Sequence, residues 1–252
     1  ELTSSVRTIY IYFNHSLEPM TDVRVRQDIN YAVNKEEIVE FVLGGAGRVS
    51  DAPISPGVFG YTPVGNYEYN PERARELLAE AGYEDGLEIT LYSPDGRYLQ
   101  DIQVTETIQS QLAEVGIDAT IETLEWAAYL ATTREPIESN SVQAALLGWG
   151  TVTGDADYGL YALFHTDQWV PDGSNRAFYS NSEIDDLLNE ARSTADQGVR
   201  AELYEEAMSI IWEDAAWLFL HSETQITAVR DEVSGLIIHP TERVLAYEAS
   251  LE

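Results

Sequence analysis

Apolar residues recur along this chain at two spacings, one typical of helices and one typical of strands. The helical spacing is clearest in two stripes, one at positions 25, 29, 32 and 33 and one at positions 102, 105, 108, 112 and 115. Runs of β-branched and aromatic residues predict strands at 9–13, 87–92, 117–124, 142–149, 217–220 and 224–229. Helices and strands therefore alternate along the chain, which is the pattern of an α/β fold.

Local start and stop signals divide the helical segments. Thr21 or Asp22 precedes the first helix, and Asn34 with Glu37 forms a capping box for a second helix that ends before Gly44. Further helices are expected after Asn70-Pro71 as far as Gly82, at 125–133, at 158–164, after Ser182, and at 199–212, and Gly116 ends the helix over 102–115. Residues 45–69 and 165–180 read as loops. No repeat or linker divides the chain, so we expect one compact unit.

The net charge is the most unusual feature of the composition. The 252 residues include 14 basic and 44 acidic side chains, a net charge of −30, with Lys35 the only lysine. Such a surface repels nucleic acid and anionic lipid, since binding either requires Lys and Arg at the contact. Repulsion between the acidic side chains is screened at high salt. The excess of acidic over basic residues therefore indicates a protein adapted to strong brine. The absence of cysteine excludes disulfides, thiolate metal sites and cysteine nucleophiles.

The residues that usually carry catalysis form no recognisable motif. The four histidines lie far apart, and neither a metalloprotease helix motif nor a phosphate-binding loop is present. Asp155 and Asp157 form an acidic pair that suits acid–base work, although an aspartate before a short helix is more often its N-cap. Asn14-His15-Ser16 matches a glycosylation sequon of low specificity. We therefore expect no enzyme activity, no cofactor and no metal.

Aromatic residues are the better indication of a binding site. Fifteen tyrosines and five tryptophans offer flat surfaces that suit small organic ligands, although most such rings fill protein cores. Trp149 lies at the end of a predicted strand, where open α/β sheets bind their ligands. Gly148 and Gly150 flank it and allow close backbone approach.

Together these segments resemble the extracytoplasmic solute-binding proteins of ABC importers, in the dipeptide, oligopeptide and nickel-binding family (family 5). Each motif is weak, but their joint order is specific and they cover most of the chain. The resemblance rests on Asn14, on DVRVRQDINYAVNKE at 22–36, YNPERARELLAEAGY at 69–83, IQSQLAEVGI at 108–117, Glu125-Trp126, Gly148-Trp149, Asp155, Asp157, RAELY at 200–204 and IIWED at 210–214.

The resemblance implies a two-lobed protein that closes on its ligand, about twice as long as this chain. All the matching segments belong to the second half of such proteins. We therefore expect residues 1–252 to be a single C-terminal lobe with the periplasmic-binding-protein-like class II fold, a mixed sheet flanked by helices. The N-terminal lobe, absent from this chain, would carry the export signal and a lipid anchor at the outer face of the membrane. The implied partners are a small ligand and the permease subunits in the membrane.

The resemblance also suggests which residues meet the ligand. In peptide-binding relatives an aspartate three residues after the strand-end tryptophan pairs with the ligand ammonium group, whereas the run here is Trp149-Gly150-Thr151-Val152. Asp155 would replace that aspartate only if the loop folds back. The other expected wall residues are Tyr10, Arg97 and Tyr98, with Arg97 able to meet a carboxylate. We expect the ligand to be a peptide or an oligosaccharide, and the alternative function is an exported hydrolase that uses Asp155 and Asp157.

Overall fold

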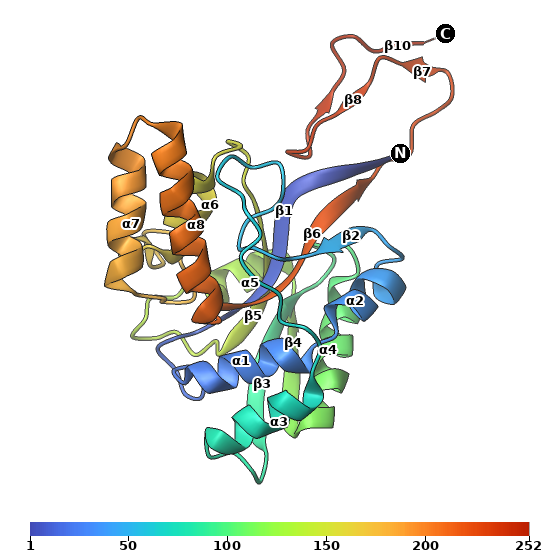
Figure 1. The fold of residues 1–252 in the computed structure, drawn as a ribbon. Coiled ribbons are helices and arrows are strands. Elements are labelled where there is room, and N and C mark those ends of the chain that lie inside the picture. The colour runs from blue at the N-terminus through green and yellow to red at the C-terminus, as the bar shows by residue number, and fades with distance from the viewer. Residues whose placement is uncertain (252) are drawn as a thin grey trace.

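A six-stranded mixed sheet runs through the middle of the molecule, and helices cover both of its faces (Figure 1). The computed structural model describes residues 1–251. The strands of the sheet, in their spatial order, are β2 (Gly47–Val49), β6 (Trp217–Ile226), β1 (Leu2–Phe13), β5 (Ala144–Gly150), β3 (Leu87–Pro94) and β4 (Ile117–Leu124). The helices are α1 (Val23–Ala32), α2 (Lys35–Glu37), the π-helical turn η1 (Ile38–Val42), α3 (Pro71–Glu80), α4 (Asp101–Val115), α5 (Trp126–Thr133), α6 (Ala156–Phe164), the 3₁₀ turn η2 (Thr166–Gln168), α7 (Ser182–Ser193) and α8 (Gln197–Glu213).

Strand directions make the sheet mixed. Strand β3 runs parallel to both β4 and β5, whereas β1 runs antiparallel to β5 and β6, and β2 runs antiparallel to β6. The carboxyl ends of β3, β4 and β5 consequently lie at the same end of the sheet, together with the first half of β1 and the last residues of β6. The predicted α/β fold with a mixed sheet between helices is confirmed.

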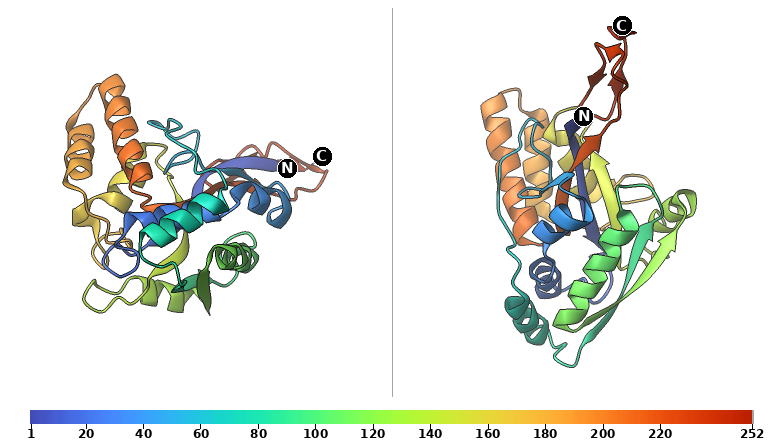
Figure 2. Two further views of the ribbon diagram at one scale, coloured as in Figure 1. Left: turned by 60° about the horizontal axis from the view of Figure 1, so that its bottom comes forward. Right: turned by 90° about the vertical axis from the view of Figure 1, so that its right-hand side faces the viewer.

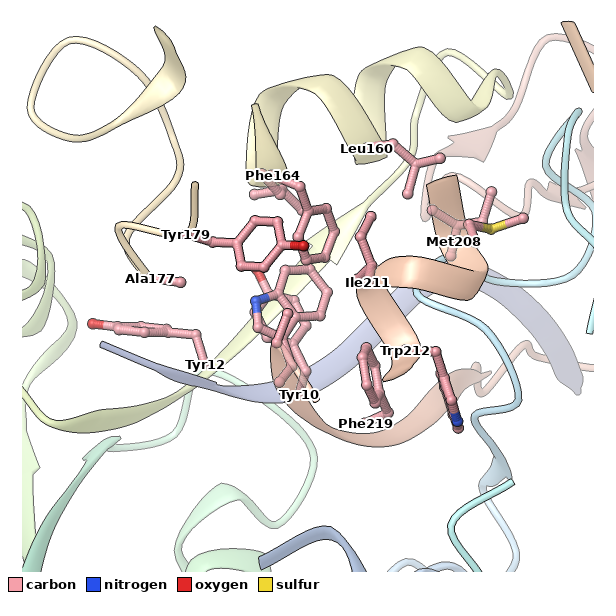
Figure 3. Close-up of a cluster of buried hydrophobic side chains, with 14 of the residues drawn as sticks. Tyr10, Tyr12, Leu160, Phe164, Ala177, Tyr179, Met208, Ile211, Trp212 and Phe219 are labelled. Carbon is pink, nitrogen blue, oxygen red and sulfur yellow. The ribbon is translucent and has the colours of Figure 1, made fainter. Parts of the chain in front are cut away.

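Strand β1 separates two hydrophobic cores because its side chains alternate between the faces of the sheet. Ile9, Ile11 and Phe13 pack with apolar residues of α1, α3 and α4. Tyr10 and Tyr12 point to the opposite face and pack with residues of α5, α6, α7 and α8. Figure 3 shows this second core, which is rich in aromatic rings. The side chains of β1 thus contribute to both cores, and the molecule has three layers: helices, the sheet, and helices on its other face.

The helix ends form largely where their capping residues predict. The side chains of Asp22 and Asn70 accept hydrogen bonds from backbone N–H groups of α1 and α3. Gly116 adopts a left-handed conformation with φ of 98°, which lets α4 end and β4 begin immediately. These elements were predictable because their signals are local in the sequence.

Several predicted boundaries are corrected. The N-cap of α7 is Asn181 and not Ser182, since the Asn181 side chain accepts from the N–H of Glu183. The helix expected after Asn34 is a short α2 that continues into η1, and the loop over 45–69 contains β2. The two strands expected at 217–220 and 224–229 form the single strand β6, because β1 pairs with it across a register shift. Strand β1 itself begins at Leu2, where polar residues hide the strand pattern.

The last 25 described residues, 227–251, project away from the sheet as one interrupted hairpin (Figure 2). Strands β7 (Val233–Ser234) and β10 (Ser250–Leu251) form one pair, and β8 (Ile237–Ile238) and β9 (Val244–Leu245) form the other. Their link to the body includes a hydrogen bond from the N–H of Val6 to the carbonyl of Pro240, at 3.0 Å. Within residues 1–251, no helix combines the length and the apolar character needed to cross a membrane.

Candidate functional site

Side chains from β1, β5, β6, α5, α6 and the loops after β3 and β5 lie at the end of the sheet where β3, β4 and β5 terminate. In the strand register Trp149 lies opposite Thr8 and Gly150 opposite Arg7, so the end of β5 adjoins the first half of β1. We call this region the strand-end surface and define it by Arg7, Arg97, Tyr98, Trp126, Trp149, Gly150, Val152, Tyr158 and Glu223. A cavity of about 260 Å³ opens there between Arg7, Arg97, Tyr98, Leu99, Glu223 to Ile226, and Glu242.

The loop after β3 holds Arg97 and Tyr98 in place. The carboxylate of Asp101, at the start of α4, accepts hydrogen bonds from the N–H groups of Gly96, Arg97 and Tyr98 at 3.2, 2.7 and 3.0 Å. Tyr98 is buried, and its hydroxyl donates to the carbonyl of Gly148 at 3.4 Å. This arrangement fixes the loop against the end of β5.

The guanidinium group of Arg97 is exposed and lies over two aromatic rings. Its central carbon is 5.2 Å from the ring centre of Tyr98 and 5.1 Å from that of Trp126. Within residues 1–251 Arg97 forms no ion pair shorter than 4 Å. Stacking on aromatic faces orients a guanidinium while its N–H groups stay free to bind a carboxylate.

Trp149 is partly exposed, and the residues around it differ in their access to solvent. Its indole Nε1 donates to the carbonyl of Tyr158 at 3.2 Å, and the two rings pack at 5.2 Å. Thr151 is buried, whereas Val152 is 41% exposed. A Cβ on Gly148 would lie 2.6 Å from Ile9 Cδ1 and 2.7 Å from Tyr98 Cε1, so it would clash. A Cβ on Gly150 would meet nothing closer than 3.7 Å. Of the two flanking glycines, Gly148 is therefore required by packing and Gly150 borders the open surface.

An ion-pair cluster at this surface escaped sequence reasoning. The Arg7 Nε lies 3.2 Å from Glu223 Oε2 and 2.6 Å from Glu242 Oε1, and the Arg7 Nη2 also binds Glu242. Burial raises the pKa of Glu223 to about 7, although the charge of Arg7 opposes the rise. Burial acts to raise the pKa of Glu242 as well, but the hydrogen bonds from Arg7 hold it below its ordinary value. No local signal reveals this cluster, because both glutamates lie more than 200 positions from Arg7. Pairing of β1 with β6 places Glu223 there, and the turn between β8 and β9 supplies Glu242.

Three predicted ligand residues lie outside the strand-end surface, and one of them, Thr151, is the buried residue described above. Tyr10 is 1% exposed, and its ring stacks on Trp217 with centres 3.5 Å apart, so it is corrected to a core residue. Asp155 caps α6 by accepting from the N–H of Asp157 and forms two hydrogen bonds to Arg200, at 3.0 and 2.9 Å. Its carboxylate is thus already paired with a cation and does not take the place of the aspartate missing at Val152.

The other sequence motifs receive structural explanations. Asp157 pairs with Arg192 at 3.1 Å, so Asp155 and Asp157 form two separate ion pairs and not a free acid–base pair. Asn14 is fully buried and donates to the carbonyl of Val142 at 3.0 Å, so its sequon is inaccessible in the folded chain. Among residues 1–251, no group of three metal-ligating side chains is close enough to hold an ion.

Comparisons with known proteins agree with this geometry. The family model described as "Bacterial extracellular solute-binding proteins, family 5 Middle" matches residues 1–170. The glutathione-binding protein GsiB of Pectobacterium atrosepticum is 32% identical over 232 residues, which are 92% of this chain and 45% of that protein. The chain therefore spans about half the length of the curated relatives it matches.

Solved structures show the same fold over the whole chain. HbpA2 from Haemophilus parasuis superposes with a TM-score of 0.88 at 28% identity, over 100% of this chain and 49% of that chain. The dipeptide-binding protein from Pseudoalteromonas sp. SM9913, solved with Met-Leu, gives 0.89 at 25% identity over 100% and 50%. With the family model matching two-thirds of its length and the fold matching throughout, this chain belongs to family 5 of the bacterial extracellular solute-binding proteins.

Proposed function

We propose that this chain is the C-terminal lobe of the substrate-binding component of an ABC importer. In this proposal the whole protein captures a peptide or a similar small solute outside the cell and delivers it to the membrane permease. The relatives support this assignment, because two of the three compared above are named for binding glutathione or a dipeptide. The proposed N-terminal lobe would close over the strand-end surface and would carry the export signal and the lipid anchor.

The observation that carries the proposal is the exposed guanidinium of Arg97 at the carboxyl edge of the sheet. It lies over Tyr98 and Trp126 and has no acidic partner within 4 Å among residues 1–251. A cation that is oriented in this way suits a ligand carboxylate, which accepts two parallel N–H bonds from a guanidinium. Trp149 and Tyr158 supply an adjoining aromatic surface. The alternative hydrolase function is not supported, because Asp155 and Asp157 are each paired with an arginine.

The side chain at position 152 argues that a peptide's ammonium group is not the main point of attachment. Val152 is exposed and apolar where an ammonium partner would stand, and Asp155 is paired with Arg200. A buried ammonium group without a partner is costly, by several kcal/mol. The ligand is therefore a peptide or peptide-like solute held mainly by its carboxylate and its apolar surface. An oligosaccharide stacked on Trp149 and Tyr158 is the second candidate.

The test is calorimetric binding to the full-length protein. We expect N-acetylation of a peptide to leave its affinity within about threefold, and C-terminal amidation or Arg97→Gln to weaken it by tenfold or more, since charged hydrogen bonds contribute about 1.5–3 kcal/mol. Arg73→Gln, which removes an exposed arginine on α3, is the matched control and keeps the affinity. Loss of tight binding on acetylation would show that an ammonium partner exists. Binding of oligosaccharides alone would replace the peptide assignment.

A further inference from the structure

A small, partly open cavity lies on the α6 side of the sheet, away from the strand-end surface. It has a volume of about 10 Å³ and is lined by Tyr10, Tyr12, Leu147, Leu163, Ser174, Arg176, Ala177 and Trp217. Figure 3 labels three of these lining residues, Tyr10, Tyr12 and Ala177. A volume of this size accommodates one particle about as large as a water molecule.

Two polar groups of the lining residues are buried hydrogen-bond donors without partners. Arg176 is 7% exposed, and its Nε is buried with no hydrogen-bond partner, as is the hydroxyl of Tyr12. No acidic side chain within residues 1–251 forms an ion pair with Arg176. Buried polar groups are nearly always paired, and a buried charge without a counter-charge is costly. The cavity therefore suits an occupant that accepts hydrogen bonds and carries negative charge.

The groups next to Arg176 do not neutralise its positive charge, and Arg134 adds a second one. Burial raises the pKa of Tyr10 and Tyr12 well above the ordinary value, against the opposing charge of Arg176, so both hydroxyls keep their protons. Burial also lowers the pKa of Arg134, and the charge of Arg176 lowers it further. Arg134 donates to the carbonyls of Pro171 and Gly173 in the loop that carries Arg176, so it does not fill the cavity itself.

We propose that this cavity is a binding site for a single chloride ion, held by Arg176 and the hydroxyl of Tyr12 with Tyr10 beside them. A monatomic anion is the charged acceptor nearest to this size, whereas carboxylates, phosphate and sulfate are much larger. Water would fit as well, but it would leave the guanidinium charge without a counter-charge. The partly exposed Ser174 provides the entrance, because the other lining residues are buried. In the brine that the acidic composition indicates, even weak affinity would keep the site filled.

The ion can be located directly in crystals of the full-length protein grown with bromide in place of chloride. We expect an anomalous bromide peak inside the cavity, within hydrogen-bonding distance of Arg176 Nε and the Tyr12 hydroxyl. An empty or water-filled cavity in such crystals would overturn the proposal.

A solution test compares thermal unfolding in 2 M sodium chloride and 2 M sodium gluconate for wild type and Tyr12→Phe. An ion bound only by the folded state raises Tm, so we expect the chloride-minus-gluconate difference to fall in Tyr12→Phe by roughly 2–6 °C, for chloride about tenfold above its dissociation constant. General salt effects act on both proteins alike. Tyr67→Phe is the matched control, since that buried hydroxyl binds the carbonyl of Trp212 outside the cavity and should leave the difference unchanged. Equal differences in wild type and Tyr12→Phe would refute the chloride site.

Discussion

Asp28 is a carboxylate placed where the surrounding chemistry favours its neutral form. It is 0% exposed on α1, and neither of its oxygens has a hydrogen-bond partner. Burial raises the pKa of Asp28 to about 8. The folded state consequently binds more protons than the unfolded state between about pH 4 and pH 8. The contribution of this group to stability is present at low pH and is lost as pH rises through that window.

Asp28→Asn should remove this pH dependence. The unfolding free energy of the variant relative to wild type should rise between pH 4 and pH 8 by several kcal/mol, at about 1.4 kcal/mol for each unit of pKa difference. Denaturant unfolding at a series of pH values measures it. Asp118→Asn, which changes an exposed aspartate on β4, is the control and should show a nearly constant difference. A constant difference for Asp28→Asn would mean that its carboxyl finds a partner in solution.

Gly148 is the residue on which the position of Tyr98 depends. Gly148→Ala places a methyl group within 2.7 Å of the Tyr98 ring, so the ring and the adjoining Arg97 must move. Overpacking of this kind costs about 1–3 kcal/mol of stability. We expect that loss in denaturant unfolding, together with weaker ligand binding by the full-length protein. Gly150→Ala on the same strand meets nothing closer than 3.7 Å and should be nearly neutral, so equal effects of the two changes would contradict the packing argument.

At the scale of elements, Asp155 joins the start of α6 to α8. It caps α6, and its ion pair with Arg200 reaches across to α8. Asp155→Asn keeps a capping side chain but loses the charge, whereas Asp155→Ala loses both. We expect Asp155→Ala to be less stable than Asp155→Asn by about 1 kcal/mol in denaturant unfolding, the usual contribution of an N-cap.

The loss of an N-cap can also be measured on a second helix, α7. Asn181 caps α7 by a side-chain hydrogen bond, so Asn181→Ala should cost a similar amount. Because Asp155 lies outside the strand-end surface, Asp155→Asn should leave ligand affinity of the full-length protein unchanged. A large loss of affinity would assign Asp155 to the ligand after all.

At the scale of the whole molecule, the net charge of −30 should make stability depend strongly on salt. Repulsion between carboxylates extends over about 10 Å at 0.1 M salt and over only about 3 Å at 1 M. We expect Tm to rise substantially between 0.1 and 2 M KCl. Scans in the same range of sorbitol separate screening from a general cosolute effect. A Tm that stays flat in KCl would exclude adaptation to brine.

A lobe that supplies one wall of a closing site should bind its ligand poorly by itself. The ligand at the strand-end surface would remain half solvated, since nothing would exclude water from its outer side. We expect the 252-residue chain to bind in the millimolar range or more weakly, about −4 kcal/mol at best. Calorimetry of this chain beside the full-length protein measures the difference, and micromolar binding by the chain alone would contradict the two-wall proposal.

Local patterns determined much of this protein. The alternation in β1, the caps at Asp22 and Asn70 and the left-handed Gly116 each depend on a few neighbouring residues, so the helices, strands and α/β class could be predicted. Trp149 could be placed at a strand end for the same reason. Periodicity missed the polar half of β1 and the joining of two segments into β6, because pairing between distant strands, and not local apolar pattern, sustains them.

Only the tertiary structure decided which side chains share a space. It buried Tyr10 against Trp217, paired Asp155 with Arg200, and left Arg97 exposed over Tyr98 and Trp126. It also assembled two clusters without any sequence signal, Arg7 with Glu223 and Glu242, and Arg176 beside Tyr12. The physical reason is that burial and charge pairing depend on distances across the sheet, which strand order and register set and which no window of neighbouring residues contains.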